Sequence, residues 1–284
     1  MAIVPERRSS DPSTSDRSDT LAFGAPVVVD AFGVSDTGHV RPNNEDHFLI
    51  ARAGRYFETL STSLPPGEVP ERADDAGYAL VVADGMGGHA AGELASRTTI
   101  REMVRLALAL PDWIVRIDKD TTAEASDRTE QRIINAHKAL LARGRKEPDQ
   151  KGMGSTVTAV RNLGRVLQVA HVGDSRAYLL RGDQLLRLTR DHTYVQLLVD
   201  TGRLSPEEAA RSTSRHVLVN AVGGVNDDVY VDVQHLPLAN GDRVLLCSDG
   251  LSDLVDDDTI RAQLLASTSS EEACRALLAR ALDE

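Results

Sequence analysis

The stretch Tyr78-Ala79-Leu80-Val81-Val82-Ala83-Asp84-Gly85-Met86-Gly87-Gly88-His89 decides how this chain folds. Its first six residues are apolar or aromatic and predict a buried strand, which ends at the carboxylate of Asp84. Burying a charge is unfavourable unless a positive group neutralises it, so an acid at this place requires a partner. The glycines that follow let the backbone approach such a partner closely. The stretch therefore predicts a functional acid at a strand end.

Two further motifs place acids beside predicted strands. Arg41-Pro42-Asn43-Asn44-Glu45-Asp46 precedes a strand that begins at His47, and Cys247-Ser248-Asp249-Gly250-Leu251 follows the apolar run Arg243–Cys247. Converging carboxylates repel one another and together favour a hard divalent cation with oxygen ligands. We therefore predict a metal site where these strand ends meet.

Composition narrows the class of protein. The chain has 284 residues, 41% of them hydrophobic, and contains no apolar run long enough to cross a membrane or to form a signal peptide. Its two cysteines suit a reducing compartment, which predicts a cytoplasmic protein. A net charge of −11 argues against nucleic-acid binding, which needs a basic face. We expect a soluble globular protein that binds neither nucleic acids nor membranes.

The chain is predicted to hold one folded domain. Residues 1–25 are rich in serine, aspartate, threonine and arginine without periodicity, which predicts a disordered polar tail. The domain is expected over residues 26–284. Inside it, the charged, proline-containing stretch Ala51–Gly77 is expected to form an exposed excursion between two strands.

Hairpin signals predominate over strand–helix–strand crossovers in the predicted order of elements. Apolar residues recur at helical spacing in two segments, Ile100–Leu108 and Ile133–Leu141. Strands are expected at Val27–Val29, Phe48–Ile50, Thr156–Arg161, Val166–Val172, Tyr178–Arg181, Gln184–Leu188, Val229–Val233 and Arg243–Cys247. The pairs Gly182-Asp183 and Asn240-Gly241 are typical of two-residue hairpin turns. Antiparallel sheets with helices segregated on their faces, an α+β layered domain, follow from this pattern.

A segment at residues 191–224 interrupts the strands with two short helical pieces and is predicted to be a flap beside the site. One piece covers Tyr194–Thr201. The other begins at Ser205-Pro206-Glu207-Glu208, where Ser205 and Glu208 fit a capping box with proline at the first helical position.

The residues alone leave several alternatives open for the acidic motifs. Gly85-x-Gly87-x-x-Ala90 formally matches a dinucleotide-binding fingerprint, but Asp84 would face a pyrophosphate with negative charge, and metal binding or a flexible turn are the other interpretations. The segment around Asp174 is either a tight turn or a further carboxylate of the cluster. The motif at Arg41 is either a polar turn or a site in which Arg41 binds a phosphate.

Nucleophile and acid candidates are few. Ser155 is not convincing as a nucleophile, because no recognisable motif supplies a His–Asp pair. His89, His171 and His192 are each candidates for a general acid, and each is also consistent with a structural role.

Taken together, the motifs resemble the metal-dependent protein phosphatases, the PPM or type 2C family, in its bacterial form. The resemblance covers about Val28 to Glu284. Its carriers are Arg41…Asn44-Glu45-Asp46, Ala83-Asp84-Gly85-Met86-Gly87-Gly88-His89-Ala90-Ala91-Gly92, Gly154-Ser155-Thr156, Val172-Gly173-Asp174-Ser175-Arg176 and Ser248-Asp249-Gly250-Leu251.

This resemblance implies a four-layer α-β-β-α sandwich of two mainly antiparallel sheets, with two and up to three Mn²⁺ or Mg²⁺ ions at one edge. By analogy Asp84 bridges two metals, the Gly85 carbonyl and, through water, Glu45 serve one of them, and Asp249 serves the other. The same analogy gives Asp174, with Asp249, a third ion. It makes Arg41 the contact to the substrate phosphate and Asp46 the residue that orients the ligands and their water. Many members carry a histidine where this chain has Met86, so the resemblance moves the acid role to His89.

The implied activity is hydrolysis of phosphoserine and phosphothreonine in proteins by a metal-activated water. The implied partners are phosphorylated proteins, among them a bacterial Ser/Thr kinase or its substrates, acted on by a monomer. Family members end with an Asp-Asn motif and a final strand, and this sequence stops at Asp283-Glu284, where that segment is expected to begin. A metal ligand and an edge strand are therefore expected to be absent, unless the sequence is a fragment. The alternatives are a phospho-binding adaptor without catalysis and, through the Gly85 motif, a nucleotide-dependent oxidoreductase.

Overall fold

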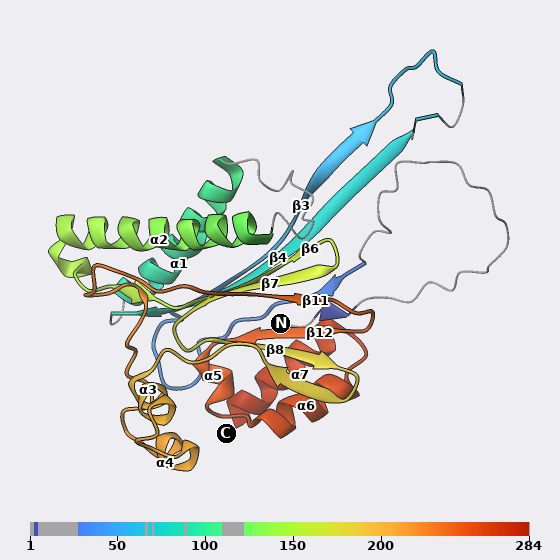
Figure 1. Ribbon diagram of the computed structural model, residues 1–284. Helices are drawn as coiled ribbons and strands as arrows, with labels where there is room; N and C mark the ends of the chain where they lie inside the picture. Colours follow the sequence, from blue (N-terminus) through green and yellow to red (C-terminus); the bar gives the residue numbers. More distant parts are fainter. Residues whose placement is uncertain are drawn as a thin grey trace.

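Two β-sheets lie face to face in a computed structural model of the chain, and helices cover the outer face of each sheet (Figure 1). The structure describes residues 3–4, 28–65, 68–69, 71–87, 90–109 and 122–283. All strand pairs in these ranges are antiparallel. The predicted four-layer α-β-β-α sandwich is confirmed.

The first sheet carries most of the strands. Its order is β10-β5-β4-β6-β7-β11, with β3 paired to β4. Its members are β3 (Asp46–Glu58), β4 (Arg72–Met86), β5 (Gly154–Ser155), β6 (Val157–Leu163), β7 (Val166–Val172), β10 (Val222–Gly223) and β11 (Asp232–Pro237). Because side chains alternate between the faces of a strand, Leu80 and Val82 point to the second sheet while Val81 packs among residues of the helical layer.

The second sheet is smaller and has the order β12-β8-β9. It consists of β8 (Arg176–Arg181), β9 (Gln184–Arg187) and β12 (Arg243–Cys247). Leu179 and Val244 face the first sheet, whereas Tyr178 and Leu245 face the helices on the other side. Both faces are therefore buried, which accounts for the near-continuous apolar sequence of β8 and β12.

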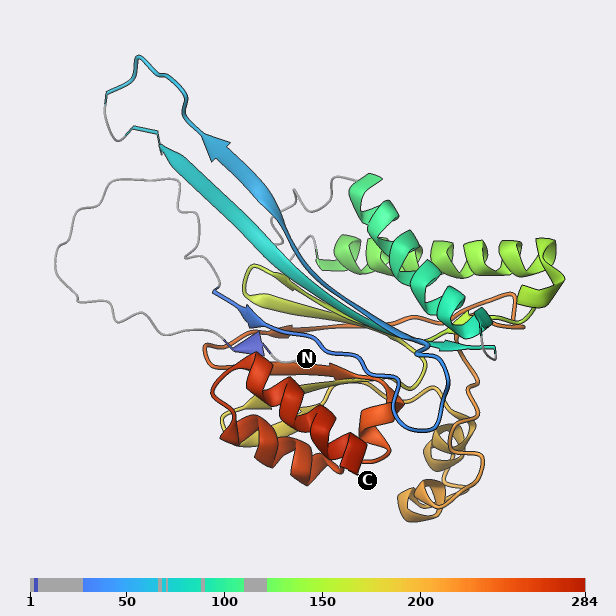
Figure 2. The ribbon, with the colours of Figure 1, turned by 180° about the vertical axis from the view of Figure 1, so that it is seen from behind.

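Helices close the sandwich on its two outer faces (Figure 2). On the first sheet lie α1 (Ala90–Ala109) and α2 (Thr122–Lys146), followed by the short 3-10 turn η2 (Pro148–Gln150). On the second sheet lie α5 (Asp249–Ser252), α6 (Asp257–Ala266) and α7 (Ser270–Asp283). Asp256 caps α6, because its side chain accepts a hydrogen bond from the Thr259 amide.

The predicted excursion at Ala51–Gly77 is largely wrong. β3 continues to Glu58 and β4 begins at Arg72, in an unbroken register from Asp46 opposite Asp84 to Glu58 opposite Arg72. Figures 1 and 2 show the two strands extending together beyond the rest of the sheet. Tyr56 and Phe57 favour strand formation, and this outweighs the charged neighbours that suggested a loop.

Two other strand predictions also need correction. Asn240-Gly241 does not turn a hairpin: β11 pairs with β7 and β12 pairs with β8, so this turn passes from one sheet to the other. The alternating valines do not form one strand either, since β11 begins only at Asp232 and leaves Val229 and Val231 before it.

The N-terminal segment differs from its prediction at two points. The strand expected at Val27–Val29 is instead β2 (Asp30–Ala31), while Val27 lies outside the described residues. β2 pairs with β1 (Ile3–Val4), so this dipeptide of the predicted tail forms a strand. The rest of residues 1–25 lies outside the described ranges.

The flap is built largely as the sequence predicts. It contains α3 (Tyr194–Asp200) and α4 (Pro206–Ala210), and Ser205 with Glu208 forms the predicted capping box. Figure 1 shows both helices beside one end of the two sheets, away from the main helical layers. Within the described ranges, no helix combines the length and the apolar character needed to cross a membrane.

Candidate active site

A pocket of about 560 Å³ lies at the ends of the central strands and is bordered by the flap. The residues that line it are Arg41, Pro42, Asn43, Glu45, Asp84, Gly85, Met86, Gly87, Thr156, Asp174, His216, Leu218 and Asp249. The sequence predicted six of these as site residues: Arg41, Glu45, Asp84, Gly85, Asp174 and Asp249. Asp46, the seventh described site residue of the prediction, pairs with Asp84 across the β3–β4 ladder.

Strand register brings the acids together. Asp46 begins β3 directly opposite Asp84 near the end of β4, and Asp249 begins α5 two residues after β12. The Thr156 hydroxyl accepts a hydrogen bond from the Asp84 amide at 2.9 Å, and the Thr156 amide donates to the Asp84 carbonyl at 2.8 Å. Thr156 therefore binds both the amide and the carbonyl of Asp84 and fixes its backbone.

The electrostatics of the cluster are unfavourable in the absence of a cation. Burial raises the pKa of Asp84 well above its usual range, and the charges of Asp46, Asp249 and Asp174 raise it further. Burial also raises the pKa of Asp174 to about 7, with the neighbouring charge of Asp249 as the next cause. Asp46 shifts in the same direction through burial, although a hydrogen bond from Ser248 opposes the shift. Positive charge bound among these carboxylates would reverse the shifts.

Glu45 adds a direct sign of a missing partner. Its side chain is buried, and its Oε1 atom has no hydrogen-bond partner, which is costly for a carboxylate oxygen. Gly85 lies close by, and a Cβ atom there would collide with the backbone carbonyl of Gly92. Backbone carbonyls and carboxylates thus crowd one spot, and this donor set of hard oxygens fits Mn²⁺ or Mg²⁺.

Arg41 brings a cation to the rim of the pocket. Its Nη1 atom contacts Glu45 Oε2 at 2.6 Å, while its side chain is 65% exposed. Such a guanidinium keeps donors free for a planar or tetrahedral oxyanion that enters from solvent. On the opposite side, the Ser248 hydroxyl donates to Asp46 Oδ2 at 2.5 Å and fixes that carboxylate.

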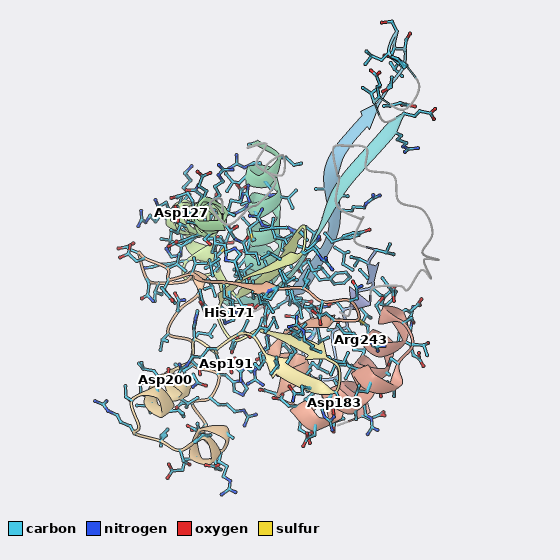
Figure 3. The ribbon with its side chains drawn as sticks, turned by 45° about the vertical axis from the view of Figure 1, so that its right-hand side comes forward. Asp127, His171, Asp183, Asp191, Asp200 and Arg243 are labelled. Atoms are coloured by element: carbon cyan, nitrogen blue, oxygen red, sulfur yellow. The ribbon has the colours of Figure 1, made fainter. Side chains whose placement is uncertain are left out.

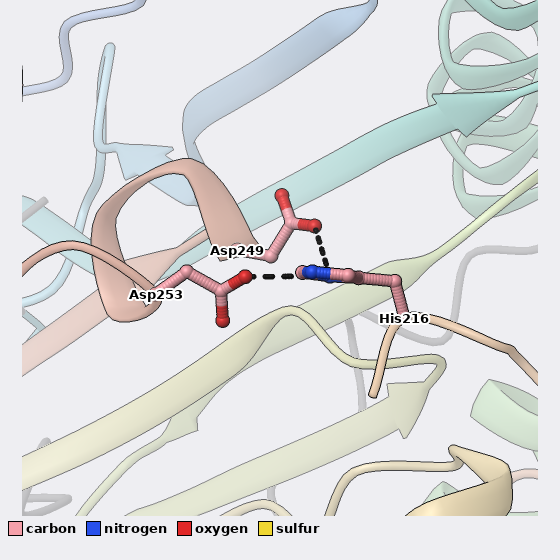
Figure 4. Close-up of side chains that lie close together, drawn as sticks. All are labelled: His216, Asp249 and Asp253. Carbon is pink, nitrogen blue, oxygen red and sulfur yellow. Dashed lines mark ion pairs between the residues drawn. The ribbon is translucent and has the colours of Figure 1, made fainter. Parts of the chain in front are cut away.

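Sequence reasoning missed His216, which comes from the flap. Its Nδ1 lies 3.3 Å from Asp253 Oδ2 and 3.7 Å from Asp249 Oδ2 (Figure 4). One possible ligand atom from each of the three residues lies within 4.8 Å of the others. Arg215 also approaches Asp253, at 3.8 Å. No local pattern around His216 could have predicted this, because the contact depends on how the flap folds back.

The other histidine predictions have different outcomes. His171 and His192 do not line the pocket, and burial lowers the pKa of His171 to about 3 and that of His192 below its usual value. Because neither side chain lines the pocket, the structure supports the structural interpretation for both histidines. His89 lies outside the described residues, and its role as acid stays a prediction.

The Gly85 motif does not form a dinucleotide site. That fold needs parallel strands joined by crossover helices, whereas β4 has only antiparallel neighbours among the described strands. Gly85 itself lies inside β4 and not in a loop that leads into a helix.

Comparison with known proteins identifies the family of the chain. The sequence profile of the protein phosphatase 2C family matches residues 71–283. The serine/threonine protein phosphatase PstP of Mycobacterium tuberculosis is 39% identical over 243 residues, which are 85% of this chain and 40% of that protein. The serine/threonine phosphatase stp of Listeria innocua is 34% identical, with 84% of each chain covered.

Solved structures give the same result. A crystal structure of M. tuberculosis PstP superposes with a TM-score of 0.68 at 37% identity, covering 88% of this chain and 90% of that one. The catalytic domain of PstP in complex with two manganese ions gives 0.67 at 36% identity, with the same coverage of both chains. This chain spans less than half the length of the full M. tuberculosis relative, but it covers the phosphatase fold of these structures. It belongs to the protein phosphatase 2C family.

Proposed function

We propose that this chain hydrolyses phosphoserine and phosphothreonine in proteins with the help of bound divalent metal ions. The observation that carries the proposal is the buried cluster of carboxylates, with its unpartnered Glu45 Oε1, beside the exposed guanidinium of Arg41. Each of the relatives described above is named a serine/threonine phosphatase, which supports the same reaction. The structure of one of them with two manganese ions supports a metal-dependent reaction.

The acids would hold the metals. Asp84 lies close to Asp46, Asp174 and Asp249, so we assign it a share in holding both ions, together with the Gly85 carbonyl, Glu45 through water, and Asp249. Asp174 with Asp249 would serve a third ion. Bound Mn²⁺ or Mg²⁺ would supply the Lewis acidity that makes a water nucleophilic near neutral pH.

The remaining residues would act on the substrate and on proton positions. Arg41 would bind the phosphoryl oxygens, for which its rim position and exposed donors are suited. Asp46, fixed by Ser248, would accept a hydrogen bond from the attacking water and orient it. His89 keeps its assignment as the donor of a proton to the leaving alkoxide.

The identity of the substrate is the finer part of the proposal. We infer that the substrates are phosphorylated bacterial proteins, including a cytoplasmic Ser/Thr kinase or its targets, and that the chain acts as a monomer. The bacterial origin of the phosphatases that resemble this chain supports that inference.

Hydrolysis of a phosphothreonine peptide tests the reaction, measured with Mn²⁺, with Mg²⁺ and with EDTA. We expect turnover with metal, none with EDTA, and a loss of at least about a thousandfold in Asp84→Ala, because this change removes the bridging ligand. Asp183→Asn, in the exposed β8–β9 turn, is the matched control and should keep full activity. Peptide binding without turnover in folded protein would instead support the adaptor alternative.

A further inference from the structure

The two ends of the flap meet at His192. The chain enters the flap at this residue and leaves it at Val219 and Asn220, which lie beside it. Thr193 forms an antiparallel bridge with Leu218, and the Tyr194 amide donates to the Val217 carbonyl at 2.8 Å. Because Leu218 lines the pocket, this junction determines where the flap sits relative to the carboxylates.

The backbone of His192 joins the flap to the turn that carries Asp174. Its amide donates to the Gly173 carbonyl at 2.7 Å, and its carbonyl accepts from the Val219 amide at 2.9 Å. One residue thus holds the return strand of the flap on one side and the residue next to Asp174 on the other.

The imidazole of His192 also joins the Gly173 turn to the returning chain of the flap, here at Asn220. Its Nδ1 atom lies 3.2 Å from the Gly173 amide and 2.8 Å from the Asn220 side-chain nitrogen. Both partners are donors, so Nδ1 is the acceptor and carries no proton. The orientation of the Asn220 amide is fixed independently, since its nitrogen donates to the Tyr230 carbonyl and its oxygen accepts from the Tyr230 amide.

Position 173 requires glycine, because its backbone conformation is one that other residues rarely adopt. Its φ is +108°, and a Cβ atom there would collide with Thr156, the residue that also fixes the backbone of Asp84. The Gly173–Asp174 turn is therefore held between Thr156 on the Asp84 side and His192 on the flap side. Asp174 itself is buried and lines the pocket.

We propose that His192 is a positioning residue: its imidazole, shared between Gly173 and Asn220, couples the placement of the flap to the placement of Asp174. It touches neither the pocket nor a reacting group, and it acts through the two residues that it holds. The proposal rests on the proposed function only for its activity readout, because the coupling to the flap can be measured in protein without substrate.

Three variants test the coupling. His192→Leu fills a similar volume without an acceptor, and His192→Asn places its Oδ1 atom close to the position of Nδ1. His235→Leu is the matched control, since His235 on β11 also bonds a neighbouring side chain, Gln168, but lies outside the flap junction. Flap opening is read as the rate of tryptic cleavage after Arg211, an exposed flap residue, at low protease concentration, where cleavage tracks the open population.

We expect His192→Leu to raise the cleavage rate by about tenfold, the effect of leaving buried donors unpaired. His192→Asn should stay within about threefold of the original protein, and His235→Leu should not change. Asn220→Ala should raise the rate as well, and the double variant with His192→Leu should fall short of full additivity, because the two changes share one bond although each also removes others. Equal cleavage in His192→Leu and the original protein, or full additivity, would overturn the proposal.

Activity completes the test. With metal and peptide present, kcat of His192→Leu should fall by about tenfold while KM stays within about twofold, because Asp174 is displaced but Arg41 is not. Restoration of kcat in His192→Asn would separate positioning from general damage to the fold. If the original protein shows no turnover with any metal, the proposed function fails, and the cleavage rates alone still decide whether His192 couples the flap.

Discussion

Asp174 is buried and Asp191 is largely shielded from solvent, both at the base of the flap, yet their pKa values shift in opposite directions. Burial acts to raise the pKa of both carboxyls, so burial alone does not distinguish them. Burial and the charge of Asp249 raise the pKa of Asp174 to about 7. Burial would raise that of Asp191 as well, but hydrogen bonds and charges from Arg176 and Arg187 lower it instead.

The difference is whether the chain supplies its own positive charge. Arg176 contacts both carboxylate oxygens of Asp191, at 2.8 and 3.2 Å, and Arg187 contacts one of them. Figure 3 shows Asp191 near His171 at the root of the flap, with Asp200 farther out on α3. Asp174 lies among other acids instead. An acid that the chain pairs with its own arginines has a structural role, whereas a buried acid without such a partner marks a place for a cation.

The largest expected effect is on the pH dependence of metal-free protein. Burial and the charge of Asp249 raise the pKa of Asp174 in the folded protein to about 7, above its usual value of 3.8, so the native state binds the extra proton. Stability from this group is therefore full below about pH 4 and is lost as the pH rises to about 7. Asp174→Asn should remove up to about 4 kcal/mol of that loss, measured by urea unfolding in EDTA at about pH 4 and about pH 8.

Two controls sharpen this result. Asp183→Asn, in a turn that Figure 3 shows far from His171 and Asp191, should leave the pH slope unchanged. Saturating Mn²⁺ should flatten the slope of the original protein, because a bound cation favours the charged carboxylates. An unchanged slope in Asp174→Asn would mean that Asp174 is solvated and that the contrast with Asp191 is not real.

Removing Arg176 from its pair with Asp191 should lower the free energy of unfolding. This change is smaller than the effect of Asp174→Asn and opposite in sign. Arg176→Met leaves Asp191 buried with Arg187 as its remaining cation, and we expect a loss of about 3 kcal/mol in the free energy of unfolding. The change is measured by urea unfolding at neutral pH. Arg187→Met should cost less, since Arg187 is the more exposed of the two and makes the single contact. Equal stability of Arg176→Met and the original protein would show that Asp191 does not depend on its arginine.

The sequence could predict the acids because their positions are local. Asp84 and Asp249 follow apolar runs, and an apolar run that ends in an acid is visible without knowing its neighbours. The β8–β9 hairpin and the capping box at Ser205 are local as well, and both are confirmed. Glycine-rich turns and caps depend on residues within a few positions of one another, so single-sequence reasoning reaches them.

What the sequence could not predict depends on contacts between distant segments. Asn240-Gly241 has the composition of a hairpin turn, but the partner of β12 is β8, some sixty residues earlier, and the turn crosses between sheets. His216 reaches Asp253 only because the flap folds back over the pocket. The two hydrogen bonds that His192 Nδ1 accepts, from Gly173 and Asn220, arise in the same way, because the chain returns past His192 at Asn220.

The smallest effect is expected where solvent does the neutralising. Glu124 and Arg128 form an ion pair at 3.0 Å on α2, and Glu124 is 62% exposed. Glu124→Gln should change the free energy of unfolding by at most about 0.5 kcal/mol, because water and salt screen the pair. A loss as large as that of Arg176→Met would contradict the comparison, since burial would then not determine how much an ion pair contributes to the free energy of unfolding. Water serves Glu124 as Arg176 serves Asp191, whereas Asp84 and Asp174 lie among other carboxylates whose charges raise their pKa values, which is why a cation belongs there.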